Sequence, residues 1–300
     1  MRLLSPTHIL VALVACAALL GGADGCSSDP NVEGAKRNIA LATPDYPEAL
    51  RLLETSLAEN PDNVEALTLK ARVLFLQGQD VRDPMERQPM VEEMMAALNR
   101  ADALSPGDEN IANIRLAAWA EEMNSGSSIL QTSGGDEAAL GKAIQAFNNA
   151  IYVQPDSASG YYNLGLAQLV NGNADEAIGP LEEAVSRGTS DPNTYVYLGR
   201  ALLSTGSNGS RALEVLEEGV ELFPDDAAVR AELLNAYAAT GQADRAVAAY
   251  EAAIARDPDD PVLRYNYGST LLQAERYDDA IVQLEQATDL DPNNANAQYN

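Results

Sequence analysis

Apolar residues recur at helical spacing along most of the chain, and the apolar runs end at prolines. Six prolines each follow such a run, and all but the second of them precede an aspartate or an asparagine. A proline ring cannot continue the hydrogen-bond ladder of a helix, and Asp and Asn are preferred caps for the helix that follows. The pattern therefore predicts an all-α chain. The six prolines are Pro61, Pro106, Pro155, Pro224, Pro258 and Pro292.

The spacing of these prolines is regular in the second half of the chain. Pro224, Pro258 and Pro292 are 34 residues apart, and the 69 residues from Pro155 to Pro224 leave room for one more repeat, whose proline is replaced by Thr189. The two earlier spacings are 45 and 49 residues, which correspond to the same period with insertions of 11 and 15 residues. A fixed period of this length indicates a repeat architecture.

Small residues stand at fixed places within each period. A glycine at the eighth place would lie where the two helices of a repeat cross, and only a small side chain permits that approach. A glycine at the fifteenth place would supply the turn between the two helices. The glycines of the eighth place are Gly165, Gly199 and Gly268, and those of the fifteenth place are Gly172, Gly206 and Gly241.

This pattern of helix, turn and helix over 34 residues resembles the tetratricopeptide repeat, over residues 30–300. The resemblance implies an all-α solenoid of stacked antiparallel helix pairs, a superhelix, because no repeat buries its apolar face alone. It also implies core places for five tyrosines. These are Tyr195, Tyr237, Tyr250, Tyr267 and Tyr277. The repeats begin at residues 30, 64, 109, 158, 192, 227 and 261.

The repeats of the two halves differ in regularity. Residues 30–157 hold divergent repeats, and we expect the insertions near 79–90 and 124–137 to lengthen turns within them. Residues 158–294 hold four regular repeats. Residues 295–300 read as the start of a further, truncated repeat, so we expect that Asn300 is not a natural end of the chain.

Charge and residue usage exclude several classes of function. The net charge is −26, which disfavours nucleic acid as a partner because phosphate binding needs clustered Lys and Arg. Such an acidic surface is typical of a salt-adapted protein or of a generally soluble one. His8, Cys16 and Cys26 are the only histidine and cysteines, so the rest of the chain has no Cys/His zinc site, disulfide or imidazole-based triad. We therefore expect no enzyme, no catalytic residue, no metal and no cofactor.

The first 26 residues carry the features of an export segment. Arg2 precedes an uncharged apolar run at 9–22, which is shorter than the roughly 20 residues of a transmembrane helix. Cys16 ends the sequence LVAC, and Cys26 stands where a polar stretch begins. The segment resembles a bacterial lipoprotein signal, which implies cleavage before Cys16 or Cys26 and a lipid anchor in the cell envelope, periplasmic or otherwise exported. Secretion without lipidation is the alternative.

The tetratricopeptide resemblance also implies a partner-binding surface. In this family the first helix of each repeat lines a concave groove, and the implied groove residues are mostly apolar or neutral. They favour an extended or helical protein segment with apolar side chains over a clamp for a terminal carboxylate. The alternative is that these residues serve packing alone. The implied groove residues are Tyr162, Leu166, Val196, Arg200, Asn235, Tyr265 and Ser269.

The sequence thus favours a non-catalytic scaffold for protein–protein interactions, exported and lipid-anchored, acting in envelope assembly, secretion or a pilus-type complex. Two alternatives remain. The repeats could recruit partners for an enzyme whose catalytic domain lies beyond residue 300, or they could bind a peptide or a glycan.

Overall fold

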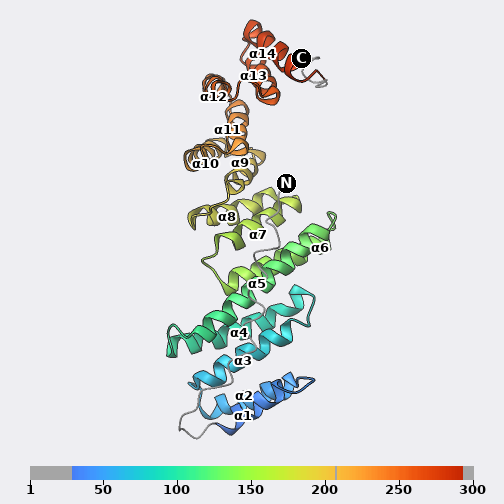
Figure 1. Cartoon of the computed structure of the whole chain (residues 1–300), viewed down its shortest axis with the longest axis vertical. Helices are drawn as coiled ribbons and strands as arrows, with labels where there is room; N and C mark the ends of the chain where they lie inside the picture. The colour runs from blue at the N-terminus through green and yellow to red at the C-terminus, as the bar shows by residue number, and fades with distance from the viewer. Residues whose placement is uncertain (1–28, 207, 293–300) are drawn as a thin grey trace. The chain divides into compact units, whose positions relative to one another are not determined.

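The computed structural model describes residues 29–206 and 208–292, and these residues form fourteen α-helices and no strand. The chain divides into two compact units, residues 1–155 and residues 156–300 (Figure 1). Within each unit, helices that follow one another pack as pairs, and each pair packs on the next. The expectation of an all-α solenoid of helix pairs is therefore confirmed.

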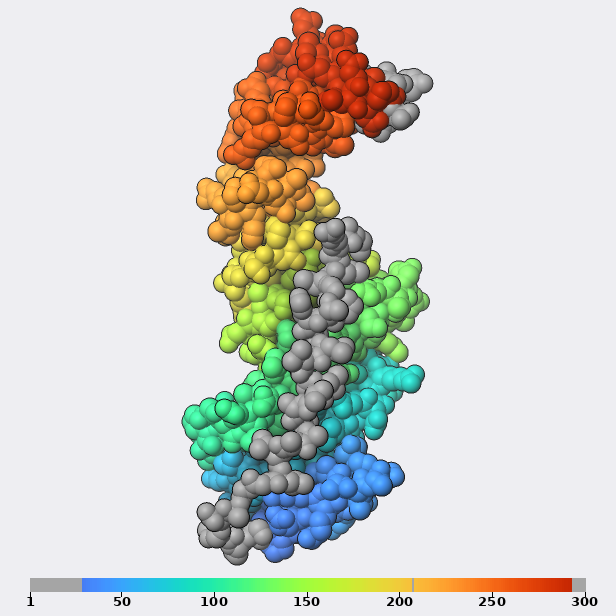
Figure 2. Space-filling view, in the orientation of Figure 1, coloured from blue at the N-terminus to red at the C-terminus, as the bar shows by residue number. Residues whose placement is uncertain are grey.

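The pairs of both units begin close to the repeat starts that the sequence predicts. The first unit contains α1 (Pro30–Ile39), α2 (Tyr46–Glu59), α3 (Val64–Gly78), α4 (Pro84–Leu104), α5 (Glu109–Thr132) and α6 (Glu137–Val153). The second unit contains α7 (Ala158–Val170), α8 (Ala174–Ser186), α9 (Asn193–Ser204), α10 (Gly209–Leu222), α11 (Ala227–Ala239), α12 (Ala243–Arg256), α13 (Pro261–Gln273) and α14 (Tyr277–Leu290). In the space-filling view the pairs of the second unit follow one another as successive bands of colour (Figure 2).

The two insertions of the first unit are mostly helical, so the expectation that they lengthen turns is wrong. Helix α4 begins inside the first insertion, because Pro84 takes the first helical position and the side chain of Asp83 caps the helix by accepting from the Met85 N–H. The second insertion extends α5 to Thr132. As a result α4 has 21 residues and α5 has 24, whereas α7 has 13.

A glycine in the extended part of α5 explains how this insertion packs as a helix. Gly126 is buried against α6, and a Cβ at this position would lie 2.7 Å from the ring of Phe147. Phe147 is itself fully buried. The absence of a side chain at Gly126 therefore lets the aromatic ring lie directly on the backbone of α5.

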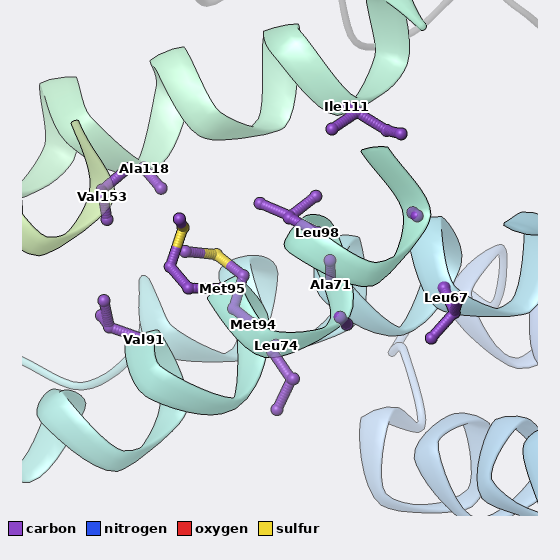
Figure 3. Close-up of a cluster of buried hydrophobic side chains, with 12 residues drawn as sticks. Leu67, Ala71, Leu74, Val91, Met94, Met95, Leu98, Ile111, Ala118 and Val153 are labelled. Atoms are coloured by element: carbon purple, nitrogen blue, oxygen red, sulfur yellow. The ribbon is translucent and has the colours of Figure 1, made fainter. Parts of the chain in front are cut away.

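The core of the first unit lies between α3, α4 and α5, with Val153 of α6 at its edge (Figure 3). Met94 and Met95 of α4 lie in this core, and each is 2% exposed. Methionine is unbranched and flexible, so it fills the irregular space between helices of unequal length. Trp119 of α5 packs against the same cluster and is the only tryptophan of the chain.

In the second unit, glycines of the eighth place lie against a leucine of the partner helix. The contact pairs are Gly165 with Leu181, Gly199 with Leu216 and Gly268 with Leu284, and a Cβ at each glycine would lie 2.6 or 2.7 Å from the leucine. The expected close crossing of the two helices is therefore confirmed. In the pair of α11 and α12 the eighth place holds Leu234 instead, and these two helices make less extensive contact than the other pairs of the unit.

The turn within each repeat of this unit uses a left-handed residue at the fifteenth place. Gly172, Gly206 and Gly241 have φ of +81°, +73° and +72°. In the last repeat the same place holds Glu275, with φ of 60°, which is the only non-glycine residue with positive φ in the described part of the chain. This conformation is costly for a residue with a Cβ, so Glu275 stores backbone strain.

Proline, aspartate and arginine close two of the junctions between repeats. The helix stops before the proline, and the aspartate two residues further on accepts hydrogen bonds from backbone N–H groups of the next helix. The arginine six residues after the proline then donates to the proline carbonyl, which would otherwise lack a partner at the helix end. The residues are Pro224, Asp226 and Arg230 at one junction and Pro258, Asp260 and Arg264 at the other.

Four of the five tyrosines with expected core places are buried, and three of these donate to a glutamate on a second helix. The bonds join Tyr195 to Glu218 (3.3 Å), Tyr237 to Glu217 (2.9 Å) and Tyr267 to Glu251 (3.1 Å). The core assignment of Tyr277 is wrong, because its side chain is 58% exposed. Tyr277 is the first residue of α14 and shares an exposed helix face with Ile281, four residues further on.

Candidate functional site

The first helices of the repeats in the second unit lie side by side and present one continuous surface. Helix α7 contacts α9, α9 contacts α11, and α11 contacts α13. We call the exposed and half-buried side chains of these four helices the first-helix face. Most of the residues that the sequence assigns to a groove belong to it.

Acidic residues are distributed unequally between the two kinds of helix in this unit. The second helices α8, α10, α12 and α14 carry 14 Asp and Glu residues, whereas the first helices carry only Glu232. Glu232 is buried, with 5% exposure. The first-helix face therefore has no exposed carboxylate, although the chain has 45 acidic residues.

Three arginines stand on the first helices, and only one of them is exposed. Arg230 and Arg264 are half-buried and hold proline carbonyls at the repeat junctions. Arg200 on α9 has a side chain that is 56% exposed, and its Nε donates to Oε2 of Glu232 on α11 at 2.7 Å. Arg200 is thus the charged group that this face offers to a partner.

An aromatic pair lies at the α7 and α9 end of the face. The rings of Tyr162 and Tyr197 are 6.2 Å apart between centroids and tilted by 34°. Burial, reinforced by the negative charge of Asp191, raises the pKa of Tyr162 well above its usual value. Both tyrosines are half-buried and are neutral at physiological pH, so they add apolar surface with a polar hydroxyl to the face.

The structure distributes the seven expected groove residues over three environments. Arg200 and Asn235 are exposed, whereas Tyr162, Leu166, Tyr265 and Ser269 are half-buried. Val196 is 3% exposed and belongs to the core between α7, α9 and α10, so its side chain is not accessible to a partner.

Some of these seven residues have contacts with one another, and others do not. Tyr162 packs against the cluster that contains Val196, and the Ser269 hydroxyl donates to the Tyr265 carbonyl. Asn235 has no side-chain hydrogen bond in the described part of the structure. The expected groove residues therefore form neighbouring patches along the face.

Sequence reasoning missed Glu232 and Tyr197, which take part in the two side-chain contacts that connect neighbouring first helices on this face. Both residues stand at the sixth place of their repeats, which the family pattern does not assign to the groove. One signal could have identified Glu232: it is the only acidic residue on four successive first helices.

The first unit contains a buried polar network in place of such a face. Arg87 of α4 donates to both carboxylate oxygens of Glu122 on α5, at 2.8 and 2.9 Å, and also to Ser125 and to the Val81 carbonyl. Asn149 of α6 donates to the Pro84 carbonyl and, at 3.4 Å, to Glu122. Burial raises the pKa of Glu122, and the bonds from Arg87 oppose this shift. The network connects three helices and has a structural role.

Two hollows are present, one in each unit. The hollow of the first unit has a volume of about 320 Å³ and is lined mainly by Leu74, Phe75, Met90 and Met94, with the ion pair of the network at its edge. The hollow of the second unit has a volume of about 790 Å³ and lies between α12, α13 and α14. Its polar lining includes Arg276 and Asp279, which pair with each other at 2.6 Å.

Metal and membrane sites are absent from the part of the chain that the structure describes. Within residues 29–206 and 208–292, no cluster of three or more His, Cys, Asp or Glu side chains could bind a metal ion. Over the same residues no helix is both long enough and apolar enough to span a bilayer. The candidate lipidation sites Cys16 and Cys26 lie outside the described residues.

Two family models, both described as tetratricopeptide repeat, match the sequence. One matches residues 40–81, 207–265 and 238–300, and the other matches residues 140–192. Together they cover more than half of the chain. No curated protein matches it.

Solved structures of repeat proteins share the fold. The crystal structure of YrrB, described as a TPR protein with an unusual peptide-binding site, is 24% identical, with a TM-score of 0.50; the match covers 59% of this chain and 89% of YrrB. The crystal structure of the MamA protein is 22% identical, with a TM-score of 0.51, and the match covers 61% of this chain and 95% of MamA. MamA from Desulfovibrio magneticus RS-1 is 18% identical, with a TM-score of 0.51, 59% of this chain and 97% of that chain being covered. At these identities the similarity concerns the fold alone.

Proposed function

The chain belongs to the tetratricopeptide-repeat family, and from this premise we propose that it is a non-catalytic scaffold for protein–protein interactions. Its ligand in this proposal is an extended or helical segment of another protein, which binds along the first-helix face. The description of YrrB as a protein with a peptide-binding site supports a peptide as the kind of ligand.

The unequal distribution of carboxylates is the observation that carries this proposal. In a chain with a net charge of −26, a face built from four helices exposes no acidic side chain. Solubility alone requires no such exclusion, because carboxylates on any exposed position serve it. A face with exposed alanines, half-buried tyrosines and one arginine suits a segment that brings apolar side chains and no strong positive charge.

A pair of alanine substitutions tests the face. Ala231 on α11 lies on the first-helix face and Ala252 on α12 lies on a second helix, and both are exposed. We expect Ala231→Glu to abolish capture of partner proteins in cross-linking experiments on intact cells, read by mass spectrometry. Ala252→Glu introduces the same charge at a matched helical position and should leave capture unchanged. Equal capture by both variants would refute the first-helix face as the binding surface.

We further propose that the chain is exported and held on a bacterial envelope membrane by a lipid on Cys16 or Cys26, where it serves an assembly, secretion or pilus-type complex. The sequence at both cysteines supports this proposal. Metabolic labelling with an alkyne fatty acid tests it with the variants Cys16→Ser and Cys26→Ser. Loss of label in one variant identifies the anchor, whereas an unlabelled wild-type chain contradicts lipidation.

A further inference from the structure

The buried carboxylate of Glu232 and the exposed guanidinium of Arg200 form an asymmetric pair. The Glu232 side chain is 6% exposed and that of Arg200 is 56% exposed, at an Nε to Oε2 distance of 2.7 Å. A carboxylate this deeply buried is strongly stabilised by its cationic partner, so it holds the guanidinium in place from below. The arginine is thereby fixed at one end while its other end faces solvent.

The geometry of the bond leaves most of the guanidinium unused. A guanidinium has five N–H donors in a planar fork, and Glu232 takes the one on Nε. The two terminal nitrogens of Arg200 have no protein partner among the described residues. Their parallel N–H groups match the two oxygens of a carboxylate.

This arrangement differs from that of the other arginines on the first helices. Arg230 and Arg264 point to the carbonyls of prolines that precede their own helices, and Arg264 also donates to Gln283. Their donors serve the junctions between repeats. Arg200 alone on the first-helix face is both exposed and held in position by a buried residue from the next repeat.

We propose that Arg200 binds a carboxylate of the partner segment and that Glu232 is the positioning residue that aims it. This inference rests on the proposed function of the first-helix face. Ala231 and Asn235 lie one residue before and three residues after Glu232 and are exposed, so the partner residues beside the carboxylate contact small or neutral groups. The carboxylate belongs to an Asp or Glu side chain or to the C-terminus of the partner.

The experiment uses an array of short random peptides, synthesised with free and with amidated C-termini and probed with the full chain. We expect bound peptides to share a carboxylate. Replacing an acidic side chain by its amide, or amidating the C-terminus, should weaken binding about tenfold, since a charge-assisted hydrogen bond at an exposed site contributes about 1.4 kcal/mol. Which of the two replacements has the effect identifies the source of the carboxylate.

Variants of the chain assign the effect to Arg200 and Glu232. The double variant Arg200→Met/Glu232→Met removes both charges, so no buried carboxylate is left unpaired. It should bind acidic and amide peptides equally. Glu232→Gln keeps the charge of Arg200 but loosens its position, and its discrimination should fall between those of the wild type and the double variant. Arg211→Met, at an exposed arginine of α10, should discriminate as the wild type does.

Circular dichroism of each variant verifies its fold, and the outcomes separate this inference from the proposal on which it rests. Peptides that bind, are blocked by Ala231→Glu and show no preference for a carboxylate would overturn the role of Arg200 and leave the proposed function intact. Binding that Ala231→Glu does not block would overturn the proposed binding surface. The absence of any bound peptide would overturn both.

Discussion

The first unit joins its long helices through a buried ion pair, whereas the second unit joins its short helices through glycine contacts and tyrosine hydroxyls. In the first, Arg87 and Glu122 are both nearly inaccessible, with 5% and 2% exposure. In the second, no ion pair is buried on both sides, and the Glu232 pair opens to solvent through Arg200. The difference places the polar groups of the first unit inside its fold and leaves one charged group of the second available to a partner.

The comparison also shows what an insertion requires. Lengthening α4 and α5 creates helix surface that the neighbouring repeats, with their shorter helices, do not cover. The polar network and the contact of Gly126 with Phe147 join the added turns to α6. The regular repeats need no such device, because small residues at fixed places already bring their helices together.

The largest effect is expected from breaking the ion pair of the first unit. Arg87→Met leaves Glu122 buried without its cation, which should lower the free energy of unfolding by about 3–5 kcal/mol. Trp119 lies on α5 and is the only tryptophan, so its fluorescence reports the denaturant unfolding of this unit.

The control for this prediction removes both charges. Arg87→Met/Glu122→Met should recover at least half of the loss, because apolar side chains of similar volume can replace a buried pair. Arg245→Met, which breaks an exposed pair with Glu217 in the second unit, should change stability by at most about 1 kcal/mol. Equal losses for Arg87→Met and Arg245→Met would show that burial of the first pair is unimportant.

Alkaline pH should unfold the second unit before the first. Burial raises the pKa of Tyr195, Tyr237 and Tyr267 to about 12, above the ordinary value of 10.0. A raised pKa means that the folded state favours the neutral phenol. Its stabilisation is complete below pH 10.0 and is lost as the pH rises through about 12.

The described part of the first unit has two tyrosines, Tyr46 and Tyr152, and neither is buried. Circular dichroism between pH 10 and 12 should therefore show partial loss of helix while the first unit remains folded. Tyr237→Phe, which cannot ionise, should move the alkaline midpoint upwards. A single transition that Tyr237→Phe does not shift would contradict this prediction.

The close helix crossings give the next effect. Gly199→Ala places a methyl group 2.7 Å from Leu216, and the resulting overpacking should destabilise the second unit by about 1–3 kcal/mol. Gly126→Ala should do the same in the first unit, where the ring of Phe147 cannot move aside easily. Gly179 on α8 has open space around it, so Gly179→Ala should stabilise by up to about 1 kcal/mol through helix propensity. Denaturant unfolding of the three variants measures the contrast, which a loss at Gly179 would contradict.

The smallest effect concerns the strained turn. Glu275→Gly should stabilise the last repeat by about 1 kcal/mol, because glycine adopts the left-handed conformation without a steric penalty. Gly241→Ala is the reverse change at the equivalent place of the preceding repeat and should destabilise by a similar amount. Thermal unfolding of both variants tests the pair, and shifts of the same sign would be inconsistent with strain at Glu275.

Much of the fold could be predicted from the sequence, because repetition averages out local ambiguity. The prolines and the glycines of the eighth and fifteenth places mark helix ends, crossings and turns in successive repeats. The insertions could not be predicted in this way. Pro84 reads as a turn residue, yet it is equally suited to the first position of a helix, and only the pairing of Arg87 with a residue 35 positions away shows which is correct.

The candidate site was predictable only in part. Arg200 and Asn235 stand at family groove places and are exposed. Val196 stands at such a place as well, but its apolar side chain gains more from the core than from solvent. The role of Glu232 depends on a contact between two repeats, and a pattern counted within one repeat cannot contain it.

The junctions closed by proline and arginine make the repeats unequal as building parts. The proline belongs to one repeat and the arginine that binds its carbonyl belongs to the next, so each closed junction is shared by two neighbours. The pair of α11 and α12 brings Arg230 at its start and Pro258 at its end, and copies of it could follow one another with every junction closed. The pair of α9 and α10 has Tyr195 at the arginine place, so it can precede such a copy but cannot close one. Lengthening the array by duplication therefore favours α11 and α12 as the unit to copy.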